Sequence, residues 1–256
     1  MDLSVCCWAL ESLSPAEMFK LIADESVQYV DVRLQDVASP EQRAALNNSD
    51  LKISSVSLAF ALWGKPFLSG DAPEATRKIA EKGLIETAQL GASIAYVIPD
   101  EDGSEQALAR FANELNHLAT FAQNQGVLLC LEHFPKRALS SIESTVGFLR
   151  EVNHPNLKLL LDSGHAQISN ESAPDALRDL GELVGFLHVN DNDGKEDLHL
   201  GLLDGVMERS SLAATLEAAA AAAYSGPVSL ELSWELDNPS SAVRRGAQLL
   251  QELGAS

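Results

Sequence analysis

The fold is decided by the stretch Leu157-Lys158-Leu159-Leu160-Leu161-Asp162-Ser163-Gly164-His165. Four leucines in so short a run are typical of a strand that is buried on both faces, as in a parallel sheet. Asp162 stands where this strand ends, and a Ser-Gly turn leads from it to His165. The pattern predicts that the end of a buried strand presents a carboxylate to a polar site.

Three further apolar runs end in the same way, each on one ionisable side chain. These are residues 127–131 with Glu132, residues 184–187 with His188, and residues 228–230 with Glu231. If the strands are parallel neighbours, two glutamates, one aspartate and one imidazole converge at one end of the sheet. Such a set, without thiolate, suits Mn²⁺, Mg²⁺, Co²⁺ or Zn²⁺, and ligand type does not choose among them. Singly, each residue has a structural explanation; jointly, they predict a site for one divalent metal ion.

Strand-like runs alternate with helix signals along the whole chain. Ser14-Pro15-Ala16-Glu17 places serine, proline and glutamate where a capping box starts a helix, and residues 39–42 repeat the device with glutamine. The other expected strands cover residues 3–10, 27–32, 53–61 and 93–98. Eight strand–helix units without a linker predict a single (β/α)₈ TIM barrel domain over residues 1–256. The alternative is an open doubly wound sheet, but no glycine-rich phosphate motif follows the first strand.

Composition limits the partners and the compartment. The 37 acidic residues exceed the 18 basic ones and give a net charge of −19, which would repel nucleic acid and anionic membranes. No apolar run reaches the roughly 20 residues that cross a membrane, and the start lacks a basic signal region. The three cysteines lie in apolar runs, as expected of buried thiols in a reducing compartment. We therefore expect a cytoplasmic protein with no nucleic-acid or membrane partner.

Polar residues outside the four strand ends are candidates for substrate binding. His165 is expected in a loop above the site, as a hydrogen-bonding group, with a surface histidine as the alternative. Residues 190–199 (NDNDGKEDLH) are expected to fold over the barrel mouth and to direct Lys195 or His199 at substrate oxygens. An exposed polar loop is the alternative, and the glutamate that closes a calcium-binding EF-hand loop is missing. Arg33 and Lys65 are candidates for binding a phosphate or carboxylate, with ordinary surface charge as the alternative.

These motifs resemble the xylose-isomerase-like barrel superfamily, and most closely its sugar phosphate isomerase/epimerase group. The resemblance is carried by residues 131–133 (LEH), 161–165 (LDSGH), 188–199 and 229–231 (SLE), and it covers essentially the whole chain. It implies that one divalent ion is bound by Glu132, Asp162, His188 and Glu231. It also implies that Glu132 and Glu231 act as the acid/base pair, and that His165 contacts a substrate oxygen.

The resemblance implies a metal-dependent sugar isomerase or epimerase that removes a proton next to a carbonyl through a metal-stabilised enediolate. A dehydratase at the same site, similar to inosose dehydratase, is the alternative, and the native ion, the substrate and its phosphorylation stay open. Asp197-Leu198-His199 resembles a zinc motif of AP endonucleases, but the net charge and the lack of any histidine before His117 oppose a nuclease. A non-catalytic barrel is a further alternative. The expected partner is a small carbohydrate, and a homo-oligomer is compatible with the sequence.

Overall fold

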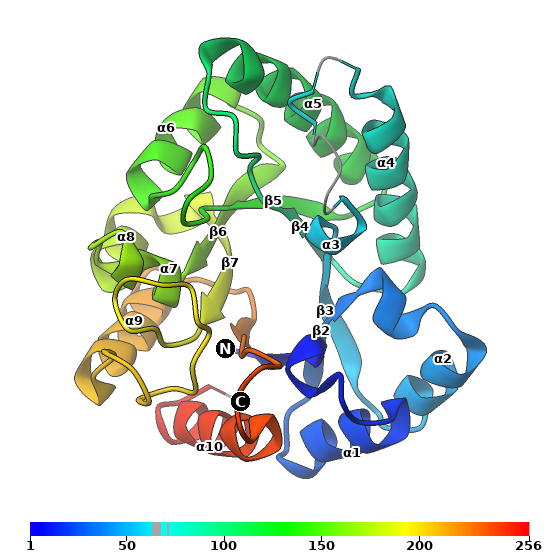
Figure 1. Cartoon of the computed structure of the whole chain (residues 1–256), viewed down its shortest axis with the longest axis vertical. Coiled ribbons are helices and arrows are strands. Elements are labelled where there is room, and N and C mark those ends of the chain that lie inside the picture. The colour runs from blue at the N-terminus through cyan, green and yellow to red at the C-terminus, as the bar shows by residue number, and fades with distance from the viewer. Residues whose placement is uncertain (63–67, 71, 256) are drawn as a thin grey trace.

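The computed structural model is a closed barrel of eight parallel strands inside a ring of helices (Figure 1). It describes residues 1–62, 68–70 and 72–255. The strands follow chain order around the barrel, and β1 pairs with β8 to close it. They are β1 (Leu3–Cys6), β2 (Tyr29–Arg33), β3 (Lys52–Ser57), β4 (Ile94–Val97), β5 (Leu128–Glu132), β6 (Leu157–Asp162), β7 (Val184–Val189) and β8 (Val228–Leu230). The predicted single-domain (β/α)₈ barrel is confirmed.

One long helix follows each strand within the described residues and packs outside the barrel (Figure 1). These helices are α1 (Pro15–Asp24), α2 (Pro40–Asn47), α4 (Glu74–Gln89), α5 (Glu105–Asn124), α6 (Ile142–Val152), α8 (Ala173–Leu180), α9 (Arg209–Ala221) and α10 (Pro239–Glu252). Both predicted capping boxes are present, because Ser14 and Ser39 accept hydrogen bonds from the backbone of Glu17 and Gln42, whose side chains accept in return. None of the described helices has the length and apolar character that a membrane span requires.

Three predicted boundaries are wrong, and in each case a short helix begins earlier than expected. Strand β1 gives way to a 3₁₀ helix, η1 (Cys7–Leu10), and β3 to α3 (Ala59–Leu62). After β6 the chain enters α7 (Ser163–Ile168) instead of a loop, because the Asp162 side chain accepts from the His165 backbone N–H and caps this helix. His165 therefore lies in a helix. The predicted candidate Lys65 lies outside the described residues.

The strand residues divide between an outer and an inner core. Leu129, Leu131, Leu159 and Leu161 belong to the large cluster that includes the helices. A separate cluster combines side chains from five strands and η1: Cys6, Trp8, Ile94, Tyr96, Cys130, Leu160 and Phe186. Because side chains alternate along a strand, the residue two positions beyond an inward one also faces inward. The candidate ligands on β5, β6 and β7 occupy such positions, so the inner cluster forms the floor beneath them.

Replacement of Phe186 tests this floor. Phe186 is fully buried and its ring centroid lies 4.7 Å from that of His188. We expect Phe186→Ala to lower the free energy of unfolding by about 3–5 kcal/mol, because a cavity replaces a large ring. Urea denaturation measures the change, with Val206→Ala as the control because Val206 is 54% exposed. Equal stability of the two variants would contradict a packed floor.

Candidate metal centre

The structure brings together all four of the predicted ligands. Glu132 and Asp162 end β5 and β6, His188 lies in β7, and Glu231 directly follows β8. Each offers one ligand atom, and these atoms all lie within 4.8 Å of one another. The four residues are 0–9% exposed. The cluster could therefore hold a metal ion at the carboxyl end of the barrel, where parallel barrels place their active sites.

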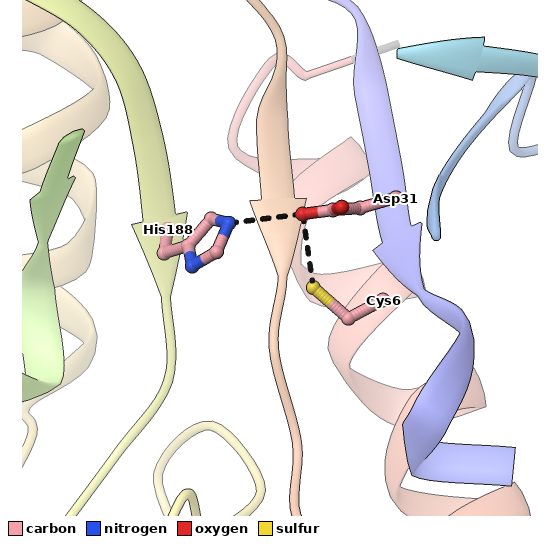
Figure 2. A group of neighbouring side chains, drawn as sticks. All are labelled: Cys6, Asp31 and His188. Atoms are coloured by element: carbon pink, nitrogen blue, oxygen red, sulfur yellow. Dashed lines mark hydrogen bonds and ion pairs between the residues drawn. The ribbon is translucent and has the colours of Figure 1, made fainter. Parts of the chain in front are cut away.

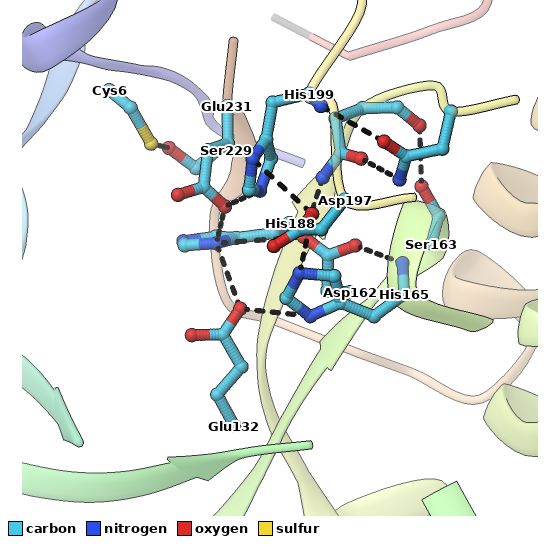
Figure 3. A network of polar contacts seen from close by, with 12 residues as sticks. Cys6, Glu132, Asp162, Ser163, His165, His188, Asp197, His199, Ser229 and Glu231 are labelled. Carbon is cyan, nitrogen blue, oxygen red and sulfur yellow. Dashed lines mark hydrogen bonds and ion pairs between the residues drawn. The ribbon is translucent and has the colours of Figure 1, made fainter. Parts of the chain in front are cut away.

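One nitrogen of His188 faces the carboxylates. Its Nδ1 lies 2.7 Å from Glu231 Oε2 and 3.9 Å from both Glu132 Oε1 and Asp162 Oδ2. Figure 3 shows Glu132 and Glu231 approaching the ring from opposite sides. Glu132 Oε1 is buried and has no hydrogen-bond partner among the described residues. A buried acceptor without a donor is costly, and a cation at this point would satisfy it.

The charges of the cluster also favour a cation. Burial raises the pKa of Glu132, and the neighbouring charge of Glu231 adds to this effect against the opposing influence of His165. Burial opposes ionisation of Glu231 as well, but His188 and His199 outweigh it and hold the pKa of this carboxyl well below its usual range. Three carboxylates in one buried volume need compensating positive charge. A divalent ion would supply more of that charge than the imidazoles alone.

Neighbouring polar groups hold Asp162 in place. Asn190 Nδ2 donates to Asp162 Oδ2 at 2.7 Å, and the His165 backbone N–H donates to Oδ1 at 2.7 Å. The Asp162 backbone N–H donates to His133 Nε2 at 3.1 Å. His133, which directly follows Glu132, is fully buried. Both oxygens of Asp162 are thus oriented before any ligand binds.

A second group of side chains adjoins the first. His165 Nε2 lies 3.2 Å from Asp197 Oδ1, and His199 Nε2 lies 3.5 Å from Glu231 Oε2. Asp162, His165 and His199 offer ligand atoms within 4.8 Å of one another and could also hold a metal ion. Burial would lower the pKa of His165, but Asp162 and Asp197 outweigh it and raise the pKa to about 10. His165 is fully buried within this network.

A pocket of about 730 Å³ opens above the cluster. Glu132, Glu231 and His199 line it together with large apolar side chains, among them Trp8, Tyr96, Phe134, Leu198, Leu200 and Trp234. His199 is thus part of the pocket lining, whereas His165 is not. Lys195 is exposed and also lies outside the lining, so the prediction that it faces the site does not agree with the structure.

No role was predicted for Asp31 from the sequence, and Asn190 was placed only in the segment expected over the barrel mouth. Asp31 is fully buried in β2, and its Oδ2 lies 3.0 Å from His188 Nε2. Asn190, also fully buried, contacts Asp162. One sequence signal could have identified Asp31: it is a charged residue between two valines of a buried strand. By contrast, Arg33 pairs with Asp36 and Glu11, so it contributes to local structure.

Comparisons with known proteins agree with this geometry. A family model described as xylose isomerase-like TIM barrel matches residues 16–253. A D-psicose 3-epimerase of Agrobacterium fabrum is 33% identical over 88 residues, which are 33% of this chain and 30% of that relative. A 3-dehydroshikimate dehydratase of Bacillus anthracis is 26% identical over 99 residues, 39% of this chain and 35% of the relative. The chain thus aligns with about a third of the length of these relatives.

Similarity to solved structures extends over the whole barrel. A D-allulose 3-epimerase from Methylomonas sp. superposes with a TM-score of 0.80, covering 99% of this chain and 98% of that one. Its sequence identity is 16%, so the likeness concerns the fold.

Gly164 offers a test of how Asp162 is supported. A Cβ at this position would overlap the side-chain oxygen of Asn190 and crowd Asn192. We expect Gly164→Ala to displace Asn190 from Asp162 and to weaken Mn²⁺ or Zn²⁺ binding by about 10–100-fold, as is typical when a group that orients a ligand is disturbed. Calorimetric titration measures the affinity. Gly147→Ala, where a Cβ meets nothing within 4 Å, is the matched control; equal affinities would contradict the support.

Proposed function

The chain belongs to the xylose isomerase-like TIM barrel family, and we propose that it is a divalent-metal-dependent isomerase or epimerase of a small sugar or sugar derivative. The observation that carries this proposal is the convergence of Glu132, Asp162, His188 and Glu231 beneath a pocket of about 730 Å³. Sugar epimerases among the relatives support the reaction class.

The donor set fits a divalent ion. Three carboxylates and one imidazole favour Mn²⁺, Mg²⁺, Co²⁺ or Zn²⁺ over softer metals. When bound here, such an ion would act as a Lewis acid that polarises a substrate carbonyl and stabilises the enediolate formed next to it. Glu132 Oε1, which has no hydrogen-bond partner among the described residues, is an atom that such an ion would satisfy.

The two glutamates suit proton transfer. Glu132 and Glu231 both line the pocket, and they approach His188 from opposite sides (Figure 3). In the proposed reaction one carboxylate removes the proton beside the carbonyl, and the other returns a proton to the opposite face of that carbon. His199 and Ser57 also line the pocket, and Ser57 Oγ is buried without a hydrogen-bond partner among the described residues. We assign these two side chains to substrate hydroxyl groups.

The charge of the pocket favours an unphosphorylated substrate. The described lining residues include four acidic side chains, Glu132, Asp197, Glu231 and Glu235, and neither lysine nor arginine. A phosphate or carboxylate would be repelled there unless it bound the metal directly. Aromatic and leucine side chains form much of the remaining wall and can pack against the C–H faces of a sugar ring.

A dehydratase is the second candidate, supported by the 3-dehydroshikimate dehydratase relative. The same proton abstraction would begin that reaction. The difference comes afterwards, because a hydroxyl group on the β-carbon leaves as water and no proton returns to the carbon. The two candidates therefore share Glu132 and Glu231 and differ in the fate of the substrate.

Hydrogen exchange into substrate tests the proposal even when the product is unidentified. We expect metal-loaded protein in D₂O to incorporate deuterium beside the carbonyl of at least one neutral ketose from a broad panel, as followed by proton NMR and mass spectrometry. Glu132→Gln and Glu231→Gln should each abolish the exchange, because each removes one partner of the proton transfer. Glu151→Gln, on the exposed surface of α6, is the control and should exchange normally.

The outcomes separate the candidates. Deuterium in an isomer or epimer supports the isomerase, whereas a product lighter by one water supports the dehydratase. Exchange that persists in both glutamine variants would contradict the assigned acid/base pair. Failure to exchange with every ketose, together with no dehydration, would overturn the proposed enzyme class.

A further inference from the structure

We propose that Asp31 is the positioning residue of the metal centre, because it fixes which nitrogen His188 presents to the ion. This role rests on the proposed function, since it requires His188 to be a ligand. Asp31 lies in β2, which is separated from β7 by β8 and β1 in the closed barrel. Both side chains are fully buried, so their contact is shielded from water.

The two ring nitrogens of His188 face different partners. Nε2 lies 3.0 Å from Asp31 Oδ2 (Figure 2). Nδ1 faces the carboxylates of Glu132, Asp162 and Glu231 (Figure 3). A carboxylate only accepts hydrogen bonds, so the Nε2–H donates to Asp31. In the neutral ring this places the free lone pair on Nδ1, on the side of the metal cluster. A histidine that binds a metal commonly donates its other N–H to a carboxylate in this way.

Packing alone cannot determine which ring nitrogen of His188 faces the metal cluster. The rings of Phe186 and Tyr96 contact His188 edge-on, with centroid distances of 4.7 and 5.2 Å. These contacts hold the plane of the imidazole. They do not distinguish the two orientations related by a half-turn of the ring, because a nitrogen and a carbon exchange places in a ring of unchanged shape. The hydrogen bond to Asp31 is directional and does distinguish them.

Asp31 is itself held by other donors. The Tyr96 O–H donates to Asp31 Oδ2 at 3.1 Å. The Cys6 thiol donates to the same oxygen at 3.5 Å (Figure 2). Cys6, Asp31 and His188 together also satisfy the distances of a metal-binding group. Three donors already converge on the one Asp31 oxygen in reach of His188, however. The geometry is that of a hydrogen-bond acceptor that orients a ligand.

Asp31→Asn tests the role with little change of shape. The amide can donate to Nε2, which would place the ring proton on Nδ1 and block the nitrogen that faces the metal site. We expect the dissociation constant for Zn²⁺ or Mn²⁺ to rise about 10–100-fold relative to wild type. Cys6→Ala is the matched control, because it removes another donor of the same oxygen and leaves the Asp31–His188 contact. Its affinity should stay close to that of wild type.

Nitrogen-15 NMR of histidine-labelled, Zn²⁺-loaded protein provides a readout that a purely structural role would not move. In wild type and Cys6→Ala, His188 should carry its proton on Nε2 and bind Zn²⁺ through Nδ1. In Asp31→Asn the Nε2 proton signal should be lost or shifted. A structural role would lower stability in both variants without changing affinity or the protonated nitrogen.

The experiments distinguish failure of the proposed function from failure of the positioning role alone. If wild type binds no ion, the proposed function falls and this role with it. If wild type binds one ion and Asp31→Asn binds it as tightly as Cys6→Ala does, only the positioning role is overturned. Should the asparagine variant not fold, the wild-type spectrum still decides, because a proton on His188 Nδ1 in the loaded protein would contradict the proposal.

Discussion

Burial of like charges is the constraint on which the barrel mouth depends. Glu132, Asp162 and Glu231 are brought within 4.8 Å of one another and of His188 because their strands are parallel neighbours that end at one level. In water such carboxylates would separate, but the sheet fixes their backbones. Positive charge inside the cluster would offset this cost. A divalent ion, as proposed, would supply such charge where the barrel gathers these carboxylates.

The rest of the structure supports the ligand cluster with packed side chains on one side and leaves a pocket on the other. Below the cluster lies an inner layer that includes Leu160 and Phe186, while Asn190 and Asp31 orient individual ligands from the sides. Above it, strand ends and loops together build a pocket whose walls combine apolar and acidic side chains. Support from packed strands gives the precision that a metal site needs, whereas loops can vary in the substrate they admit. On the proposed function, most of the support for the ion would thus come from the strands, and much of the choice of sugar from the loops.

The barrel and its strand-end cluster could be predicted because their signals are local. A buried run and the residue that ends it are neighbours in sequence, so Asp162 could be placed even with its partners unidentified. The role of Asp31 could not be predicted, because it depends on a contact with His188, which lies 157 residues away in the sequence. The helix that begins directly after Asp162 was not predicted, because the Ser-Gly pair at its start is typical of turns. Lys195 lies in a local turn, in which its backbone N–H donates to the Asp193 side chain, and its own side chain is exposed.

Anomalous X-ray diffraction from crystals of the Zn²⁺-loaded protein tests the central claim most directly. The account predicts one strong peak at about 2.0–2.2 Å from an oxygen of each of Glu132, Asp162 and Glu231 and from Nδ1 of His188. The peak should vanish when both glutamates are replaced by glutamine. A cluster without an ion, or an ion held only by the adjoining histidines of α7 and the β7–α9 loop, would contradict it.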